Sequence, residues 1–344
     1  MDISLMSIDD KGTLYTWTYV DEVFKYVSKH KTMEGSSKYG SLCVSPNGRY
    51  AVTEHLRHAR LWNVETDELL AQIEGYWDGL CISSFSISDE FVATLGKDGI
   101  VRLYKHGCNS SQLTENVNGG PIIFSPDGKQ LMVQNGNYSL SIWNVANKTK
   151  TISVQSMWYV LFATWVPHSN FIVTMCVNGK GYVWDIETGE NVAIIVEFSR
   201  TQTSVTSSHD GTYIAIAGCK NNMIWRTSDW KKERDLEQLE DSHSVSSLSF
   251  SSNDKMIAGS GSYRNPMIII WDVETGLHLH TLRHDRWVSG VAFVPIDYRA
   301  VKRMRETMLA ISIVMEQRDL QDNIFFPREL WSKCLKYVSW KDWV

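Results

Sequence analysis

Hydrophobic residues alternate with polar ones in short runs along most of the chain, and polar turns separate the runs at regular intervals. Alternation with a period of two is typical of β-strands that bury one face. Near the end of one such run an aromatic residue recurs every 39 to 46 residues, at Trp17, Trp62, Tyr104, Trp143, Trp184, Trp225 and Trp271. A period near 40, found seven times, predicts a repeat protein made of small β-sheets.

Two phrases recur around these aromatic residues. A polar turn and another strand follow the aromatic, as in LWNVETDELL from Leu61 and IWDVETGLHL from Ile270. A tight turn rich in Pro, Asn, Asp and Gly precedes it, as in VSPNGRYAV from Val44 and FSPDGKQLM from Phe124. Each repeat therefore supplies four short strands, named a to d in chain order. One such sheet cannot bury both of its faces alone.

These motifs resemble the WD-repeat β-propellers, in which four-stranded blades surround a central axis. The dipeptide that names the family stands at Trp184-Asp185 and Trp271-Asp272. The resemblance covers residues 1–295 and implies an all-β, seven-bladed propeller. The first residues supply strands b, c and d of one blade, and RHDRWVSGVAFVP from Arg283 supplies a lone strand a. We therefore expect strands from both chain ends to close the ring, which removes its unpaired edges.

The resemblance also implies a polar set in each blade, made of a His before strand a, a Ser or Thr in strand b, an Asp in the b–c turn and the aromatic of strand c. Asp98 alone stands six residues before its aromatic, and His284 is the clearest match for the His. We expect this bonding to differ between blades. Leu56 and Cys219 stand at the Asp position of blades 2 and 6, so we predict that these two blades are the softest.

The pattern changes to a helical one after Pro295. Apolar residues follow in steps of three and four, which predicts one face of a helix: Val301, Met304, Met308, Ile311 and Met315. Pro327 is well placed to begin a second helix. We therefore predict that residues 296–344 form a separate, short C-terminal α-helical module.

Within this module the phrase FPRELWSKCLKYVSWKDW resembles the opening of an F-box, and the SOCS box is the alternative match. Both resemblances imply docking to a cullin-RING ubiquitin ligase through a linker protein. They assign that docking to Phe326, Pro327, Glu329, Leu330, Cys334, Leu335, Tyr337 and Val338. The other interpretation is a helical hairpin that packs on the propeller and only stabilises it.

Charge and composition exclude several classes. The 34 basic and 39 acidic residues give a net charge of −5, so we expect no nucleic-acid partner. The chain begins MDISLMSIDD, which does not resemble a secretion signal, and it has no long apolar run, so we expect no membrane partner and a cytoplasmic location, with the nucleus not excluded. The six cysteines are far apart with no CxxC pair, which favours free thiols.

Motifs for catalysis or cofactor binding are not found. His278 and His280 alternate on a predicted outer strand, which favours a solvated edge over a metal site. No phosphate-binding loop, nucleophile elbow or metalloprotease motif occurs. We therefore expect no enzyme activity, no metal and no cofactor, and a propeller enzyme is the least favoured alternative.

The loops between strands d and a, and between b and c, open on one face of a propeller, here called the top face. Aromatic residues and arginines are the types that anchor interfaces. On this basis we predict that a partner binds Tyr39, Arg57, Arg60, Trp77, Trp158, Tyr159, Tyr263, Arg264 and Trp287. The competing interpretation is that some of these aromatics cap the blade core.

Together these features favour a non-catalytic interaction scaffold. We expect a substrate receptor that binds a protein or peptide target on its top face and docks a ubiquitin ligase with its tail. The alternative is a scaffold of a multiprotein complex whose tail is only structural.

Overall fold

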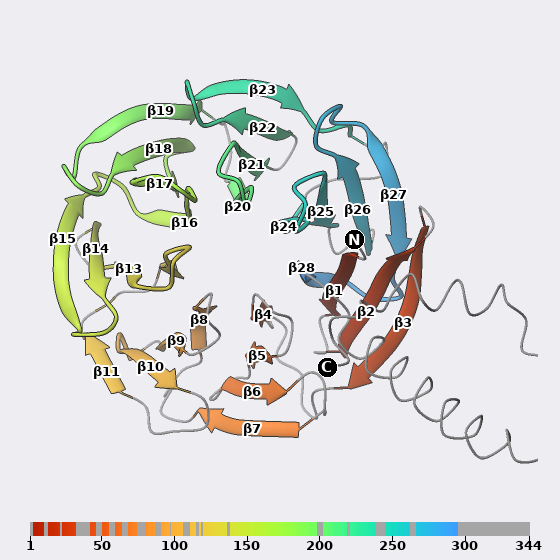
Figure 1. Cartoon of the computed structure of the whole chain (residues 1–344), viewed down its shortest axis with the longest axis horizontal. Helices are drawn as coiled ribbons and strands as arrows, with labels where there is room; N and C mark the ends of the chain where they lie inside the picture. Colours follow the sequence, from red (N-terminus) through yellow and green to blue (C-terminus); the bar gives the residue numbers. More distant parts are fainter. Residues whose placement is uncertain are drawn as a thin grey trace, which may run out of the picture. The chain divides into compact units, whose positions relative to one another are not determined.

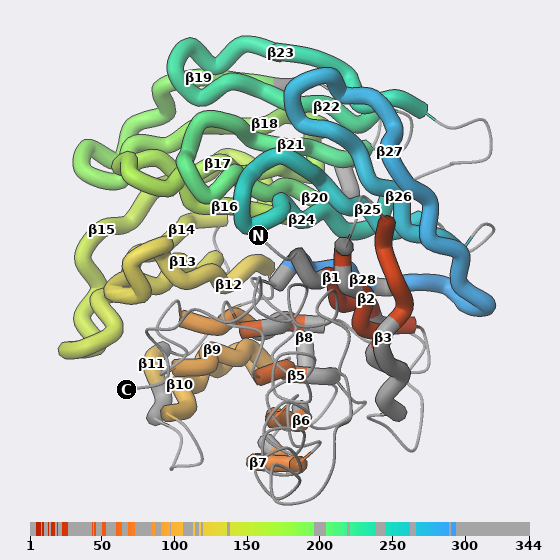
Figure 2. The backbone as a smooth tube through the Cα atoms, turned by 45° about the vertical axis from the view of Figure 1, so that its right-hand side comes forward, coloured from red at the N-terminus to blue at the C-terminus, as the bar shows by residue number. Residues whose placement is uncertain are grey.

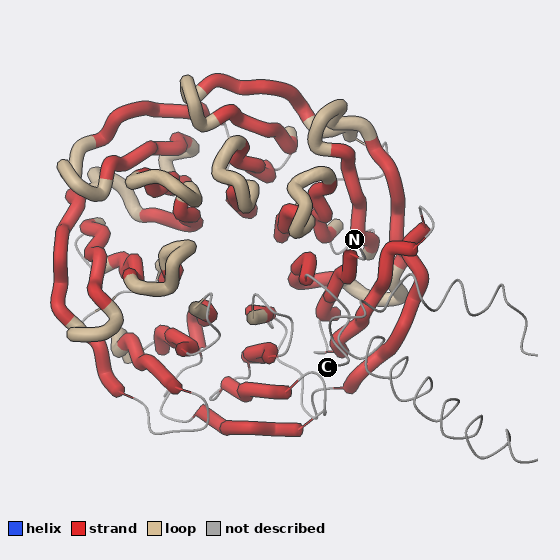
Figure 3. Tube along the Cα trace, in the orientation of Figure 1, coloured by secondary structure: helices blue, strands red, loops and turns tan. Residues whose placement is uncertain are grey.

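The described part of the chain is built from strands and loops, without a helix (Figure 3). The computed structural model describes residues 3–9, 13–20, 23–31, 42–45, 50–54, 59–63, 68–73, 80–86, 91–96, 98–105, 111–114, 117, 120–135, 138–197, 202–218, 221–238, 245–261 and 266–294. The predicted helical module, residues 296–344, lies outside these residues, so the division into two domains stays a prediction.

The strands form seven four-stranded antiparallel sheets, which surround a common centre as the blades of a propeller (Figure 1). Blade 1 contains β28 (Val288–Val294), β1 (Ile3–Asp9), β2 (Thr13–Val20) and β3 (Val23–Lys31). Blade 2 contains β4 (Leu42–Val44), β5 (Tyr50–Glu54), β6 (Ala59–Asn63) and β7 (Glu68–Ile73). Blade 3 contains β8 (Leu80–Phe85), β9 (Phe91–Gly96), β10 (Val101–Lys105) and β11 (Ser111–Thr114).

The other four blades follow in chain order. Blade 4 contains β12 (Ile122–Phe124), β13 (Gln130–Gln134), β14 (Ser139–Asn144) and β15 (Thr149–Gln155). Blade 5 contains β16 (Val160–Trp165), β17 (Phe171–Cys176), β18 (Lys180–Asp185) and β19 (Asn191–Glu197). Blade 6 contains β20 (Gln202–Ser207), β21 (Tyr213–Gly218), β22 (Asn222–Arg226) and β23 (Lys231–Asp235). Blade 7 contains β24 (Ser247–Phe250), β25 (Met256–Ser260), β26 (Met267–Asp272) and β27 (His278–Arg283). The prediction of an all-β, seven-bladed propeller is confirmed.

The hydrophobic core lies between neighbouring blades. One cluster joins Ala215 and Ile224 of blade 6 to Phe250, Ile257 and Trp271 of blade 7, and similar clusters fill the seams between other neighbouring blades. Strand b is therefore buried on both of its faces, and in β9, β13, β17 and β21 every residue after the first is buried. This explains why these strands are mainly apolar, although Thr94, Gln134 and Thr174 are buried polar residues within them.

Blade 1 is completed by strands from the two ends of the propeller sequence, as predicted. β1 pairs antiparallel with β28, from Ser4 opposite Val294 to Asp9 opposite Val288 (Figure 2). The side chains of Leu5 and Val288 are fully buried in the core that blade 1 shares with blade 7. The pairing places β1 between β28 and β2 inside the sheet, and β28 becomes the innermost strand of blade 1.

A polar set links both chain ends inside blade 1. Ser7 Oγ lies 3.4 Å from His284 Nε2, across 277 residues of sequence, and it accepts a hydrogen bond of 3.4 Å from Trp17 Nε1. Asp9, which is 1% exposed, accepts bonds from the Thr13 amide at 2.7 Å and from the Tyr15 hydroxyl at 3.1 Å. The acid of this set is Asp9, which stands eight residues before Trp17. The search for an acid six residues before the aromatic therefore did not find it.

The polar bonding differs between blades, as expected. In blade 5 Trp184 Nε1 donates to Thr174 Oγ1 at 2.9 Å, whereas in blade 7 Trp271 Nε1 donates to the backbone oxygen of Glu237 at 2.8 Å. The Nε1 atoms of Trp143 and Trp225 are buried with no partner among the described residues. Blade 6 thus lacks the tryptophan bond, and its softness, like that of blade 2, stays a prediction.

The a–b turns on the bottom face share one arrangement. In five blades the side-chain oxygen of a buried serine accepts a hydrogen bond from the amide five residues later, at 2.9 to 3.0 Å. The serines are Ser45, Ser86, Ser125, Ser208 and Ser251. This repeated bond accounts for the recurring turn phrase in the sequence.

Candidate functional site

A group of exposed apolar side chains lies on the top face of blades 4 and 5. Tyr138 is 49% exposed, Met157 82%, Trp158 44% and Val177 45%. These four residues, called the blade 4–5 patch, come from the b–c turn of blade 4, the d–a loop between the blades and the b–c turn of blade 5. The other large apolar residues that are exposed in the described part of the chain, Val23, Tyr26, Leu69, Val192, Ile194, Leu277 and Leu279, lie on or beside outer strands.

Backbone hydrogen bonds tie the three loops of the patch together. The amide of Ser156 donates to the backbone oxygen of Tyr138 at 3.1 Å, and the amide of Val177 donates to that of Tyr159 at 3.0 Å. Ser156 Oγ donates to the backbone oxygen of Trp158 at 2.8 Å and accepts from the Trp158 amide at 3.2 Å. These hydrogen bonds hold the loops beneath the apolar side chains in place, which lowers the entropy cost of binding.

Tyr138 adopts a backbone conformation that bulky residues rarely use. Its φ is 59°, in the left-handed region. Asn135 holds the residues that follow, because its side-chain nitrogen Nδ2 donates hydrogen bonds to Ser139 Oγ and Ser141 Oγ. Strained residues of this kind concentrate at functional sites. In this turn the unusual conformation coincides with an exposed tyrosine.

The patch carries no charge of its own. Residues 135–138, 156–159 and 177–179 include no Asp, Glu, Lys, Arg or His. Beneath it lies Cys176, where burial raises the pKa of the thiol to about 11, so the thiol is neutral at physiological pH. Such a surface is suited to apolar and aromatic groups of another protein rather than to an ionic ligand.

The predicted top-face residues are only partly described. Trp158 and Tyr159 lie together, and Trp158 is a member of the patch. Arg60 is the second residue of strand c in blade 2, and Trp287 comes just before strand a of blade 1. Both residues are half-buried. Arg60 Nε and Trp287 Nε1 are buried and have no hydrogen-bond partner among the described residues. Tyr39, Arg57, Trp77, Tyr263, Arg264 and the eight tail residues lie outside the described residues. The assignment of all these residues to partner binding stays a prediction.

Three members of the patch were missed from the sequence. Tyr138, Met157 and Val177 stand in or beside turns, where polar residues are the usual choice. The available signal was an apolar residue at a position where the repeat predicts a turn. A search for aromatic residues and arginines does not include methionine or valine.

The described residues contain no group of three His, Cys, Asp or Glu side chains placed to hold a metal ion. In the same part of the chain, no helix is long and apolar enough to cross a membrane.

Comparison with known families agrees with the fold. Residues 235–272 match the model of the family "WD domain, G-beta repeat". The segment runs from the end of β23 to the end of β26, so it covers one full repeat between blades 6 and 7. The match supports a WD-repeat propeller.

Three curated proteins are similar to this chain. The APC/C activator protein CDH1 of Saccharomyces cerevisiae is 24% identical over 208 residues, 56% of this chain and 36% of that protein. A protein of Gallus gallus that is part of chromatin assembly factor 1 is 26% identical over 168 residues, 46% of this chain and 26% of that protein. Target of rapamycin complex subunit wat1 of Schizosaccharomyces pombe is 20% identical over 240 residues, 66% of this chain and 75% of that protein.

The names of these relatives are those of an activator protein and of components of larger assemblies. The chain spans 36% and 26% of the length of the first two. The comparisons therefore support protein partners in general.

Proposed function

We propose that this protein is an interaction scaffold that binds a protein or peptide target through the blade 4–5 patch. The observation that carries the proposal is the exposure of four apolar side chains on three loops whose backbones are joined by hydrogen bonds. A soluble monomer exposes such residues singly, and a rigid group of them marks an interaction site.

The finer form of the proposal gives the C-terminal segment a second role. The F-box-like phrase from Phe326 to Val338 would dock a cullin-RING ubiquitin ligase through its linker protein, so the propeller would act as a substrate receptor. The support for this step is the sequence phrase itself. A cytoplasmic location belongs to the same proposal.

The patch is tested by quantitative affinity purification of three proteins. These are the unaltered chain, the double variant Met157→Ser, Trp158→Ser, and the matched control Val192→Ser, Ile194→Ser. The control removes exposed apolar side chains, 47% and 58% exposed, from the outer strand of the same blade. We expect partners to be depleted at least tenfold with the patch variant only. Equal recovery of partners by the patch variant and the unaltered chain would refute the proposed site.

The tail is tested separately by deletion of residues 320–344 and by Leu330→Asp. The substrate-receptor proposal predicts loss of the ligase linker with target binding intact. The alternative, a scaffold with a structural tail, predicts that no linker co-purifies and that the deletion lowers the melting temperature.

A further inference from the structure

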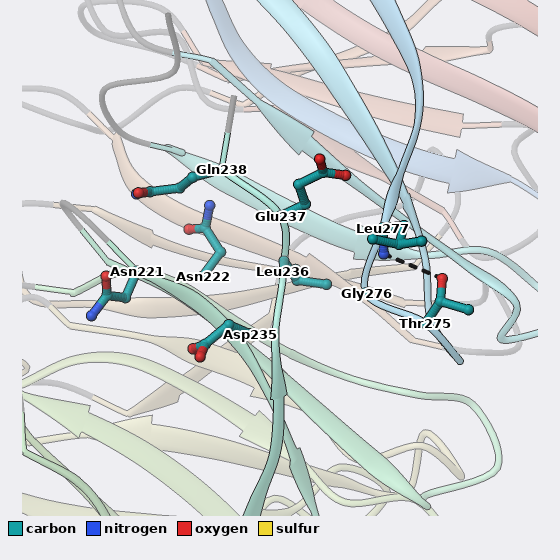
Figure 4. Close-up of a pocket in the computed structure, with 9 residues that line it drawn as sticks. All are labelled: Asn221, Asn222, Asp235, Leu236, Glu237, Gln238, Thr275, Gly276 and Leu277. Atoms are coloured by element: carbon teal, nitrogen blue, oxygen red, sulfur yellow. Dashed lines mark hydrogen bonds between the residues drawn. The ribbon is translucent and has the colours of Figure 1, made fainter. Parts of the chain in front are cut away.

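The outer side of the seam between blades 6 and 7 contains a cavity of about 340 Å³ that is separate from the blade 4–5 patch. One wall is the segment from Asp235 to Gln238, and the facing wall is the turn from Thr275 to Leu277 (Figure 4). Asn221 and Asn222 complete the lining. The volume is at the lower end of the range for small-ligand sites.

Three hydrogen bonds hold Glu237 on the first wall. Its amide donates to the backbone oxygen of Gly276 at 2.8 Å, and its own backbone oxygen accepts from Trp271 Nε1 at 2.8 Å. Its carboxylate oxygen Oε2 accepts from the His278 amide at 2.7 Å. A carboxylate can accept more than one hydrogen bond, so Glu237 is a fixed negative group with capacity for further donors.

The two walls are close at their base. Gly276 has a φ of 73°, and a Cβ atom at this position would lie 2.6 Å from the backbone oxygen of Asp235. Glycine is therefore required for the turn to lie against the strand. The cavity has walls that the backbone itself holds in place.

Asn222 adds an unsatisfied acceptor to this cavity. The residue is 5% exposed, and its side-chain oxygen Oδ1 has no hydrogen-bond partner among the described residues. Figure 4 shows its amide group pointing toward the chain at Glu237 and Gln238. An unpaired buried acceptor is unfavourable, and a ligand with N–H donors would remove that cost.

Charge in the lining is negative. Asp235 and Glu237 line the cavity, and no Lys, Arg or His does. Asp235 is already paired with Lys232 Nζ at 2.6 Å, so Glu237 is the carboxylate that a ligand would meet. Leu277, which is 56% exposed, lies across from it and offers an apolar surface.

We propose that this cavity binds the guanidinium group of an arginine side chain from a partner protein. Guanidinium carries five N–H donors in one plane, so it can form charge-assisted hydrogen bonds with the Glu237 carboxylate. The aliphatic stem of the arginine then lies along Leu277. The unpaired Asn222 Oδ1 lies beneath the surface of the same cavity and is the second acceptor that the guanidinium would approach.

The test is an NMR titration of the full ¹⁵N-labelled chain with three blocked tripeptides, Gly-Arg-Gly, Gly-Lys-Gly and Gly-citrulline-Gly. Citrulline has the shape of arginine without its charge. The readout is the His278 amide, which donates to Glu237. We expect the arginine peptide to shift this resonance and to bind at least tenfold more tightly than the other two. Equal affinity for citrulline or for lysine would overturn the assignment.

Two variants locate the site. Glu237→Gln keeps the size of the side chain and removes its charge, and we expect at least tenfold weaker binding of the arginine peptide. Glu274→Gln is the matched control, since Glu274 is exposed in the same turn but does not line the cavity. Equal weakening by both variants, or none by Glu237→Gln, would refute the proposal. The double variant Met157→Ser, Trp158→Ser should bind the peptide normally, so this test is independent of the proposed function.

Discussion

On the bottom face of blades 4 and 5, the turns satisfy their own polar groups. Ser125 Oγ donates to Asp127 at 2.6 Å, and the Asp185 side chain accepts from the Glu187 amide at 2.8 Å. On the top face of the same blades, the loops pair their backbones but leave Met157 and Trp158 exposed. The strands are shared, so the difference lies in the connections alone.

This difference separates residues that build the propeller from residues available for binding. The same serine bond recurs in the bottom turns of five blades, blade 4 among them, which is the behaviour of a folding element. The top loops of blades 4 and 5 have no counterpart in that repeat. Loops on a rigid scaffold are where binding residues concentrate. Four stability measurements test this contrast.

The largest loss should come from the strands that both faces share. Ile172 in β17 is 1% exposed, and Ile172→Ala should lower the free energy of unfolding by about 2 to 5 kcal/mol because it leaves a cavity between blades 4 and 5. Urea denaturation measures this change. The exposed Val192→Ala is the control and should change stability by less than about 0.5 kcal/mol. Equal losses of stability from Ile172→Ala and Val192→Ala would contradict the burial of Ile172 in the core.

The next effect concerns His284, a top-face residue that is half-buried within blade 1. Burial lowers the pKa of His284 from 6.5 to about 4. Between these values the unfolded chain binds a proton that the folded chain does not, so stability falls as pH drops from about 6.5 to 4, by at most about 3 kcal/mol. Unfolding free energies at pH 7, 5 and 4 should diverge from those of His284→Gln in this window. A constant difference between the two proteins would contradict the half-buried neutral histidine.

A smaller loss should follow from the bottom turn of blade 4. Ser125→Ala removes the acceptor of the Gln130 amide and the donor to Asp127, and should cost about 1 to 2 kcal/mol. Thermal unfolding checks this value. The variant should retain its partners, because it alters only the folding element. Loss of partners without loss of stability would remove the contrast between the faces.

The smallest effect on stability should come from the patch itself. Met157 is 82% exposed, so Met157→Ser should change the free energy of unfolding by less than about 0.5 kcal/mol. Urea denaturation of Met157→Ser and Ile172→Ala in parallel measures the smallest and the largest expected losses of unfolding free energy. A large loss at Met157 would make it a structural residue.

The repeat made most of the fold predictable. Aromatic residues such as Trp184 and Trp271 recur because each blade packs on its neighbours in the same way, and the lone strand from Arg283 required a partner at the other chain end. Asp9 was missed because it is the last residue of β1 and stands eight residues before Trp17, not six.

The candidate site was less predictable for a physical reason. Trp158 and Tyr159 could be placed because they come just before strand a of blade 5. Tyr138 and Val177 could not, since the exposure of a turn residue depends on which neighbouring loops cover it. The Glu237 cavity was also invisible, because it joins the end of blade 6 to a turn of blade 7 that lies about 40 residues further along the chain.

The most direct test of the central claim is site-specific photo-crosslinking. A photoreactive phenylalanine analogue replaces Met157 in one protein and Ile194 in another, both exposed residues of blades 4 and 5 or their connecting loop. If the blade 4–5 patch binds the target, irradiation should give one defined protein adduct from position 157 and none from position 194. Adducts from position 194 with none from position 157 would contradict the account.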